Sequence, residues 1–462
     1  MQKILLLIAS LFYFNFILAE NEIKSWQGIH ETPLSRLEQQ FAEPPVEFAN
    51  HVIWGWEGKM DKKTICNDLD SIKKKGFRAV IFEAGYKLPF KYLSEEWFKA
   101  IRTGVLEAKK RGMKVWIIDE GKYPSGFAGG KFSQERPDLR MQALVIGDTI
   151  QIKRGEVMTN HKIAPEIISA VAVSTSGAPN RTVAINNGEI SFNAGLDDWK
   201  ILLVKSDFRT AVTRAVNNPN GGKDATNSLC DYLNPVAVQQ FIDWTHEQYK
   251  KYLGKELGTT VLGFRGDEPD YAHLPWTPSI VQTFKDTKGY DPTPYLASFF
   301  TTSPTIQEQR VKADYWDVWS SLFATHFFKL QADWCAANGV AHITHLNKEH
   351  EMPACVKAEG DYFRNLSKVQ IPGVDAIWNQ IWPGTLNDFP KLASSVAHVY
   401  GKPRAFSESF AAYHISPTIP QAKFVVDHQI ARGINFFEFM FWPAGSKHRN
   451  WMSDPGMKGL NE

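Results

Sequence analysis

The chain has 462 residues, a net charge of +2 and 22% charged residues. This charge balance excludes a strongly basic nucleic-acid-binding surface, and the length exceeds what one small domain needs. The cysteines are few and widely spaced, and no two of them form a C-x-x-C pair. We therefore expect buried thiols, with room for one adventitious bridge, rather than a disulfide framework.

The first 19 residues have the features of a secretory signal peptide. Lys3 supplies a positive start, residues 4–18 are mostly apolar, and Ala19 ends the segment at a cleavage point. The apolar stretch is too short for a membrane span. We expect a secreted or periplasmic protein with no membrane span after signal removal. Residues 20–50 are expected to form a polar lead-in.

One unit recurs along the chain, a helix that ends at glycine and is followed by a short apolar run. The first example is a helix from about Asp61 to Gly76, with a strand that begins at Phe77. Repeated units of this kind predict a (β/α)8 TIM barrel, with an open doubly wound sheet as the alternative. We assign residues 51–138 and 213–445 to the barrel and residues 446–462 to a C-terminal tail. The eight predicted strands begin near His51, Phe77, Met113, Val261, Val340, Val374, Arg404 and Ile434.

Residues 139–212 interrupt this rhythm between the third and fourth strands. Short runs alternate apolar and polar residues, and Asn187-Gly188 is a hairpin turn signal. We expect a small β-rich insert outside the barrel. After it, Asn234 caps a helix with Pro235 in its first turn, and that helix is expected to continue through Tyr249.

Acidic residues follow the predicted strands at the points where the strands end. The carboxyl ends of barrel strands meet on one face, where barrel enzymes place their chemistry. Gathering unpaired like charges does not stabilise a fold, so these acids indicate cation binding, a polyhydroxylated ligand or acid–base catalysis. The acids at these positions are Glu83, Asp119, Glu120, Asp267, Glu268, Glu349, Glu408 and Glu438.

Tryptophans lie beside these acids, notably Trp378 and Trp442. A sugar has apolar faces and many hydroxyl groups, so indole rings next to carboxylates suit a carbohydrate ligand. Ring packing in the core is the alternative for part of this group. The predicted substrate-binding residues are Asp119, Glu120, Asp267, His345, Asn347, Asp375, Trp378, Glu438 and Trp442.

A zinc site is disfavoured by spacing. His345, Glu349 and His350 read H-x-x-x-E-H, which matches neither H-E-x-x-H nor H-x-x-E-H. Calcium held by carboxylate and backbone oxygens is compatible with the acids, but the sequence assigns no metal ligands. The sequence shows no glycine-rich phosphate loop, dinucleotide fingerprint or nucleophile elbow.

Several long motifs, in order between about residues 40 and 445, resemble family 106 of the glycoside hydrolases, the α-L-rhamnosidases. These motifs are DEGKYPSGFAGG (119–130), DYLNPVAVQQFIDWTHEQYKKYLG (231–254), GDEP (266–269), PWT (275–277), GDYFRNLSKVQIPGVDAI (360–377), SSVAHVYGKPRAFSES (394–409) and RGIN (432–435).

The resemblance implies a (β/α)8 barrel and an exo-acting, inverting glycosidase that cleaves α-L-rhamnosides or a related deoxysugar linkage in an oligosaccharide or polysaccharide. It also implies a calcium ion near the sugar, although no cofactor is predicted to be required. Glu268 of GDEP would be the general acid, and Glu408 and Glu349 would be candidates for the base or for ligands. We expect Glu408 to be the base, because strand seven lies across the barrel from strand four.

The chain departs from the family in two respects. Family enzymes usually carry β-sandwich domains after the barrel, whereas this sequence ends at Glu462, and Thr344 precedes His345 where relatives more often have glycine. A catalytically inactive or truncated barrel that only binds plant or microbial glycan is therefore the alternative function.

Overall fold

The computed structural model describes residues 33–445 except 47–48, 57, 86–87, 122–123, 210–227, 270, 272–273, 386 and 414–416. The predicted signal peptide and the predicted C-terminal tail lie outside the described residues. Part of the predicted lead-in is described, and it contains helix α2 (Leu34–Ala42).

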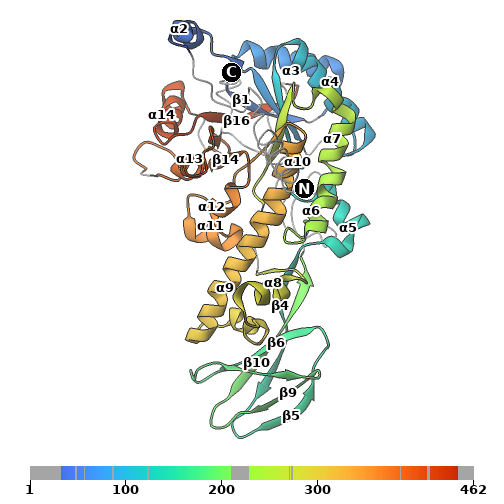
Figure 1. The fold of residues 1–462 in the computed structure, drawn as a ribbon, viewed down its shortest axis with the longest axis vertical. Helices are drawn as coiled ribbons and strands as arrows, with labels where there is room; N and C mark the ends of the chain where they lie inside the picture. The colour runs from blue at the N-terminus through green and yellow to red at the C-terminus, as the bar shows by residue number, and fades with distance from the viewer. Residues whose placement is uncertain are drawn as a thin grey trace, which may run out of the picture.

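Eight parallel strands close into a barrel in the order β1-β16-β15-β14-β13-β11-β3-β2. They correspond one to one with the eight strands predicted from the sequence, so the TIM barrel is confirmed and the open sheet is wrong. Figure 1 shows the barrel with its surrounding helices in the upper part of the molecule. The barrel strands are β1 (His51–Trp56), β2 (Ala79–Ala84), β3 (Lys114–Ile118), β11 (Val261–Gly266), β13 (Ala341–Thr344), β14 (Ile371–Ala376), β15 (Phe406–Ser409) and β16 (Phe436–Pro443).

The helices between these strands begin and end at residues that suit them. Asp61 accepts a hydrogen bond from the Thr64 amide, and Ser94 accepts one from the Trp97 amide, so each caps the helix that follows. Gly76 and Gly112 take positive φ angles just past two helix ends, a conformation that glycine adopts readily. The helices and helical turns are α3 (Lys62–Lys74), α4 (Glu95–Lys110), η2 (Ala128–Gly130), α5 (Lys131–Glu135), η3 (Pro137–Leu139), α6 (Pro235–Trp244), α7 (His246–Leu253), η4 (Gly254–Glu256), α8 (Ile280–Lys288), η5 (Thr293–Phe300), α9 (Ile306–Leu322), η6 (Phe323–Phe328), α10 (Lys329–Ala337), α11 (Met352–Glu359), α12 (Tyr362–Leu366), α13 (Pro390–Val399) and α14 (Ile419–Ile430).

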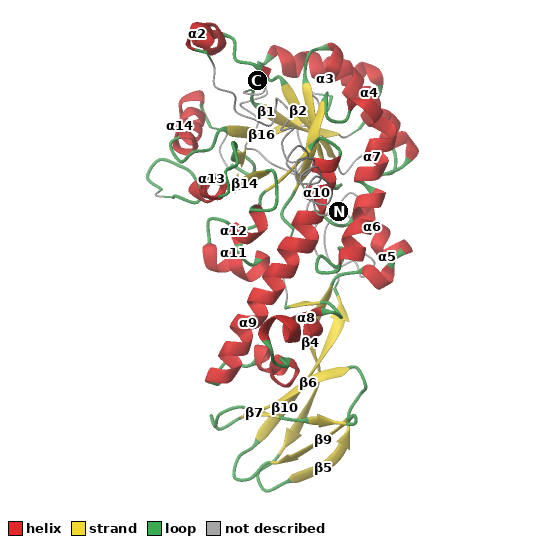
Figure 2. Cartoon of the chain, in the orientation of Figure 1, coloured by secondary structure: helices red, strands yellow, loops and turns green. Residues whose placement is uncertain are grey.

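Strands from the segment between β3 and α6, together with one later strand, form two antiparallel sheets outside the barrel, at the lower end of the molecule in Figure 2. The five-stranded sheet has the order β12-β4-β10-β6-β7, and the three-stranded sheet has the order β5-β9-β8. The fold class therefore includes the β-rich insert that alternation predicted. Its strands are β4 (Gln142–Ile152), β5 (Val157–Lys162), β6 (Ile167–Ser174), β7 (Arg181–Thr182), β8 (Ile185–Asn186), β9 (Glu189–Asn193) and β10 (Trp199–Phe208).

Strand β12 (Pro275–Trp276) completes the five-stranded sheet, although it follows the barrel strand β11 in the chain. Pro275 pairs with Ala143 and Trp276 pairs with Gln142. The sequence did not predict this strand. The outer sheet is thus built from two separate parts of the chain.

The single helix predicted from Pro235 through Tyr249 is wrong, because the structure has two helices there. Thr245 leaves helical geometry, with φ −113° and ψ −83°, and its hydroxyl donates to the Phe241 carbonyl at 2.7 Å. This local hydrogen bond competes with continuation of the helix. His246 therefore begins a new helix, α7.

Apolar side chains fill both the barrel interior and the layer between the sheet and the helices. Trp54, Trp56 and Trp97 are fully buried in that outer layer. The four cysteines are free thiols, so the adventitious bridge does not form. Within the described part of the chain, no helix has the length and apolar character needed to cross a membrane.

Candidate active site

A pocket of about 160 Å³ opens among the segments that follow the barrel strands. Six of the acids named from the sequence and one predicted tryptophan line it. The carboxyl ends of four neighbouring strands, β11, β13, β14 and β15, contribute most of its wall, as the barrel rule expects. The lining residues are Glu83, Asp267, Glu268, Asn347, Lys348, Glu349, His350, Asp375, Ile377, Trp378, Gln380, Glu408, Ala411, Ala412 and Met440.

Arg265, on β11, lies fully buried beneath this pocket and neutralises part of its acidic charge. Its guanidinium pairs with Asp267 at 2.6 Å, with Glu438 at 3.2 Å and with Glu408. Burial of a charge is unfavourable unless it is paired, and these three carboxylates supply the pairing. The network holds side chains from three barrel strands in fixed positions.

His345 extends the same network. Its Nε2 lies 2.8 Å from an Arg265 nitrogen and 3.3 Å from Glu408, and its Nδ1 lies 2.9 Å from the Leu346 carbonyl. Burial and the Arg265 charge lower the pKa of His345, but hydrogen bonds to the neighbouring carboxyl groups raise it more, so the pKa lies well above the usual value. His345 is fully buried and supports the pocket from behind.

Glu268 faces the pocket from a strained backbone position. Its φ angle is +39°, which is unfavourable for a residue with a side chain, and Pro269 follows directly. Burial and repulsion from Asp267 raise the pKa of Glu268 to about 8. A carboxyl group with a pKa raised in this way keeps its proton near neutrality, which is the form that a general acid needs.

Asp375, at the end of β14, shares this environment. Its carboxyl oxygen, a Glu268 oxygen and a His345 nitrogen lie within 4.8 Å of one another. Burial and repulsion from Glu408 raise the pKa of Asp375 well above its usual value. Two adjacent buried carboxyl groups cannot both ionise easily, so Glu268 and Asp375 titrate as a pair.

The two candidate bases differ in how they are held. The Glu408 side chain is 8% exposed in the pocket and pairs with Arg265 at its inner side. The Glu349 side chain is only 1% exposed, and one of its oxygens accepts the Leu346 amide at 3.0 Å. Both line the pocket, and Glu408 offers more of its surface to a bound molecule.

Asp119 and Glu120 do not line the pocket, although both were predicted to bind substrate. Asp119 accepts the Ser125 hydroxyl at 2.6 Å, and the same hydroxyl accepts the Asp267 amide at 2.8 Å. Glu120 accepts amides at positions 121, 128 and 129. These two acids therefore hold the segment after β3 in shape and fix Asp267 indirectly.

Trp442 is also outside the pocket. Along the β1–β16 pair, Val52 is opposite Phe439 but Trp54 is opposite Trp442, so β16 contains one extra residue in between. A bulge of this kind reverses which face the following side chains occupy. Trp442 therefore packs in the outer core with the buried Trp54, and the substrate-binding prediction for it is not supported.

The chain matches a known protein family. The family model described as alpha-L-rhamnosidase, glycoside hydrolase family 106, matches residues 164–443, which is more than half of the chain. The chain belongs to this family. The resemblance seen in the sequence motifs is thereby confirmed.

Two individual proteins are similar to this member of family 106. One, from Formosa agariphila, carries the description "Putative beta-glucuronidase" and is 24% identical over 92% of this chain and 39% of its own length. The other is the solved structure of a rhamnosidase from Novosphingobium sp. PP1Y, 15% identical, with a TM-score of 0.66 over 90% of this chain and 56% of that chain. The chain thus spans about two fifths to about half of these relatives, and the structural likeness supports the barrel fold.

Several residues in or beneath the pocket of this family 106 chain were not among the predicted site residues. They include the buried Arg265 and the lining residues Lys348, His350 and Gln380. The sequence could have indicated Arg265, because an arginine inside an apolar strand is buried and is tolerated there only next to acidic side chains. Lys348 had none, since its role depends on how the segment after β13 turns.

The pocket fits a calcium ion only in part. Calcium prefers six to eight oxygen ligands. Asp267 and Glu408 are already paired with Arg265, and His345 would contribute nitrogen. Asp375 Oδ1 is buried and has no hydrogen-bond partner among the described residues, so Asp375 is the residue whose chemistry fits.

Proposed function

We propose that this chain is a glycoside hydrolase that removes single terminal α-L-rhamnose or related deoxysugar residues with inversion of configuration. The observation that carries the proposal is the single pocket lined by Glu268, Glu408 and Glu349, in which burial and repulsion raise the pKa of Glu268 to about 8. Glycoside hydrolysis needs such a pair, an acid for the leaving oxygen and a base for water. Family membership supports the same reaction class.

Glu268 is proposed as the general acid. Its position next to the end of β11 is fixed by the strand and by the Ser125 hydrogen bonds on both sides of Asp267. A proton donor must reach the glycosidic oxygen within hydrogen-bond distance, which a rigid position favours. The paired Asp375 supports this role, because repulsion between the two carboxyl groups keeps one proton in the site.

Glu408 is proposed as the general base, and Glu349 is the alternative. Glu408 comes from β15, three strands away from β11 in the barrel order, so its carboxylate approaches the pocket from a different side than Glu268 does. Separation of this kind leaves room for a water molecule and a sugar, as an inverting mechanism requires. Arg265 fixes the inner side of Glu408 and leaves the outer side to the pocket.

The size of the pocket supports action on one terminal sugar. Its volume of about 160 Å³ lies below the range of roughly 300–1,000 Å³ that is usual for drug-sized ligands. The half-exposed Trp378 offers an apolar face at the same pocket.

A β-glucuronidase is a second candidate, favoured by the Formosa agariphila relative and by Lys348. An ammonium group in the pocket wall could pair with the carboxylate of a uronic acid. The surrounding acids, however, would repel that carboxylate. The electrostatic balance of the pocket therefore favours the uncharged deoxysugar.

Export is proposed on the apolar residues 4–18 alone.

The substrate proposal is tested by assaying the purified full chain on aryl α-L-rhamnoside, aryl β-D-glucuronide and a panel of other aryl glycosides. We expect hydrolysis of the rhamnoside, with the inverted anomer appearing first by NMR. Glycan binding without hydrolysis of any member of the panel would contradict the enzyme proposal and support a barrel that only binds glycan.

A further inference from the structure

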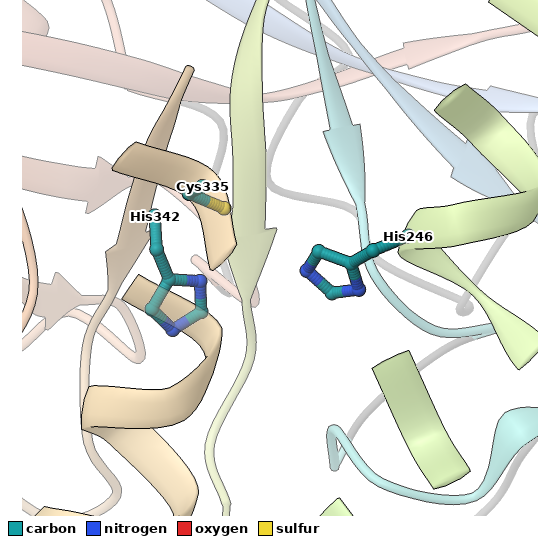
Figure 3. Close-up of side chains that lie close together, drawn as sticks. All are labelled: His246, Cys335 and His342. Carbon is teal, nitrogen blue, oxygen red and sulfur yellow. The ribbon is translucent and has the colours of Figure 1, made fainter. Parts of the chain in front are cut away.

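Three potential metal ligands meet in the layer between the barrel sheet and its helices, away from the sugar pocket. His246 begins α7, Cys335 lies on α10 and His342 lies on β13. One ligand atom from each lies within 4.8 Å of the other two, and all three residues are buried. Figure 3 shows their side chains pointing toward a common point.

The hydrogen bonds around His246 leave one ring nitrogen available to a ligand. The Thr245 hydroxyl donates to the Phe241 carbonyl, so it can only accept from His246 Nδ1, 2.9 Å away. The proton of the ring is therefore on Nδ1, and Nε2 carries a lone pair. Nε2 is buried and has no hydrogen-bond partner among the described residues. A second hydrogen bond that fixes the tautomer in this way is usual for metal-binding histidines.

His342 is even less satisfied. Both of its ring nitrogens are buried without a hydrogen-bond partner within the described ranges. Buried polar groups are nearly always hydrogen-bonded, so an imidazole with two unsatisfied nitrogens needs an explanation. Burial lowers the pKa of His342 to about 3 and that of His246 well below its usual value, so both rings are neutral and can donate lone pairs.

We propose that His246, Cys335 and His342 form a structural site for a thiophilic d10 metal ion, Zn²⁺ or Cu⁺. Thiolate and imidazole are the ligands that these ions prefer. Ligand atoms around such an ion, with bonds of about 2.0–2.3 Å, lie roughly 3.3–4 Å apart. The three ligand atoms here lie within 4.8 Å of one another. The acidic pocket offers oxygen ligands instead, so the two sites select different ions.

Aromatic rings pack around the cluster. The His246 ring lies 4.1 Å from the Phe264 ring and 5.2 Å from the Trp334 ring, centroid to centroid. Phe264 is the strand partner of His342, so aromatic rings cover the cluster on the sheet side as well. A bound ion would join α7 to α10 and β13, which follow one another much later in the chain.

Metal binding at this site releases one proton and transfers no electrons. The S–H bond of Cys335 breaks, its proton passes to solvent, and the sulfur lone pair forms the bond to the ion. The two imidazoles donate lone pairs and keep their remaining protons. The ion keeps the oxidation state in which it is supplied.

The test uses the full chain, stripped by a chelator and then titrated with Zn²⁺, or with Cu⁺ under anaerobic conditions. We expect one ion per chain, an increase in melting temperature, and an X-ray absorption spectrum with one sulfur and two nitrogen neighbours. Alkylation followed by peptide mapping should show slower modification of Cys335 after loading, with the buried Cys230 and Cys355 as internal references.

Cys335→Ala should weaken metal binding by more than about 100-fold, because loss of a ligand should exceed the loss of about 10–100-fold that follows removal of a hydrogen bond to a ligand. The control variant Cys355→Ala should bind the metal as the wild type does. Stoichiometric binding by Cys335→Ala would place the ion elsewhere and overturn the proposal. If Cys335→Ala does not fold, the wild-type measurements still test the proposal. An absorption spectrum without a sulfur neighbour, or alkylation of Cys335 that metal loading does not slow, would overturn the proposal.

Discussion

Arg265 and Glu408 form an ion pair across the barrel interior, from β11 to β15. The same guanidinium pairs with Asp267 and Glu438, so one cation balances three buried acids. The candidate acid Glu268 is not one of these three acids. Burial and repulsion from the nearby Asp267 raise the pKa of Glu268 to about 8.

Replacing Arg265 by methionine should destabilise the fold by about 3–5 kcal/mol, because it leaves buried carboxylates without their partner. The free energy of unfolding in urea measures this loss. Arg310→Met is the control, since Arg310 is largely exposed in a 3.8 Å pair with Asp314. Equal losses in the two variants would show that the Arg265 network does not support the barrel.

Replacing Glu268 by glutamine should lower turnover of substrates with poor leaving groups by about 10²–10⁴-fold. An activated aryl leaving group needs less protonation, so its hydrolysis should decrease less. In the wild type, activity should fall as pH rises through about 8, where Glu268 loses its proton. Equal decreases on both substrate types would remove Glu268 from the acid role. Glu135→Gln, on the exposed side of α5, is the matched control.

The same residue should make stability depend on pH. The pKa of Glu268 is about 8 in the folded chain against a usual value of 4.5, so between these pH values the folded state holds a proton that the unfolded state has released. Stability from this group is therefore full below about pH 4.5 and is lost as pH rises toward 8. Glu268→Gln should gain stability relative to the wild type from pH 5 to pH 8 in urea unfolding. A constant difference across this range would contradict the raised pKa.

The two candidate bases are separated by their substrate dependence. Loss of the base removes water activation, which both good and poor leaving groups require. Glu408→Ala should therefore lower turnover of both substrate types by similar factors of about 10²–10⁴, whereas Glu349→Ala should retain more activity. The reverse order would assign the base to Glu349. Thermal unfolding of both variants checks that the pocket stays folded.

Lys348 distinguishes the two candidate substrates. Lys348→Ala should leave hydrolysis of an uncharged rhamnoside within about threefold, while it lowers any activity on a glucuronide by removing the partner of the sugar carboxylate, an interaction of roughly 1.5–3 kcal/mol. KM values for both substrates measure the effect. A larger loss on the rhamnoside than on the glucuronide would show that Lys348 contacts a sugar hydroxyl instead.

The strands and the acids after them could be predicted because their signals are local. Gly76 and Gly112 mark helix ends, the apolar runs that follow are strands, and parallel strands bring their carboxyl ends together whatever the details of packing. Glu268, Glu349 and Glu408 therefore meet in one pocket as predicted. Asp119 was expected there too, but it does not line the pocket, and one of its oxygens accepts the Ser125 hydroxyl instead.

The remaining features depend on contacts between elements that are distant in sequence. Trp442 leaves the pocket because of one extra residue in β16, and the alternation of apolar residues in the sequence does not reveal a bulge. The break at Thr245 depends on a hydroxyl that bonds back to Phe241, although helical periodicity continues through it. Arg265 acquires its partners only when the barrel closes.

The pairing of β12 with β4 affects the order in which the chain can fold during synthesis. Residues 142–208 are made well before Pro275 and Trp276, so the first residues of β4, Gln142 and Ala143, lack their partner strand until β11 has also been made. An unpaired edge exposes amide and carbonyl groups that can join another chain. Slowing translation between β10 and β12 should therefore increase aggregation of nascent chains, whereas slowing it after Trp276 should not.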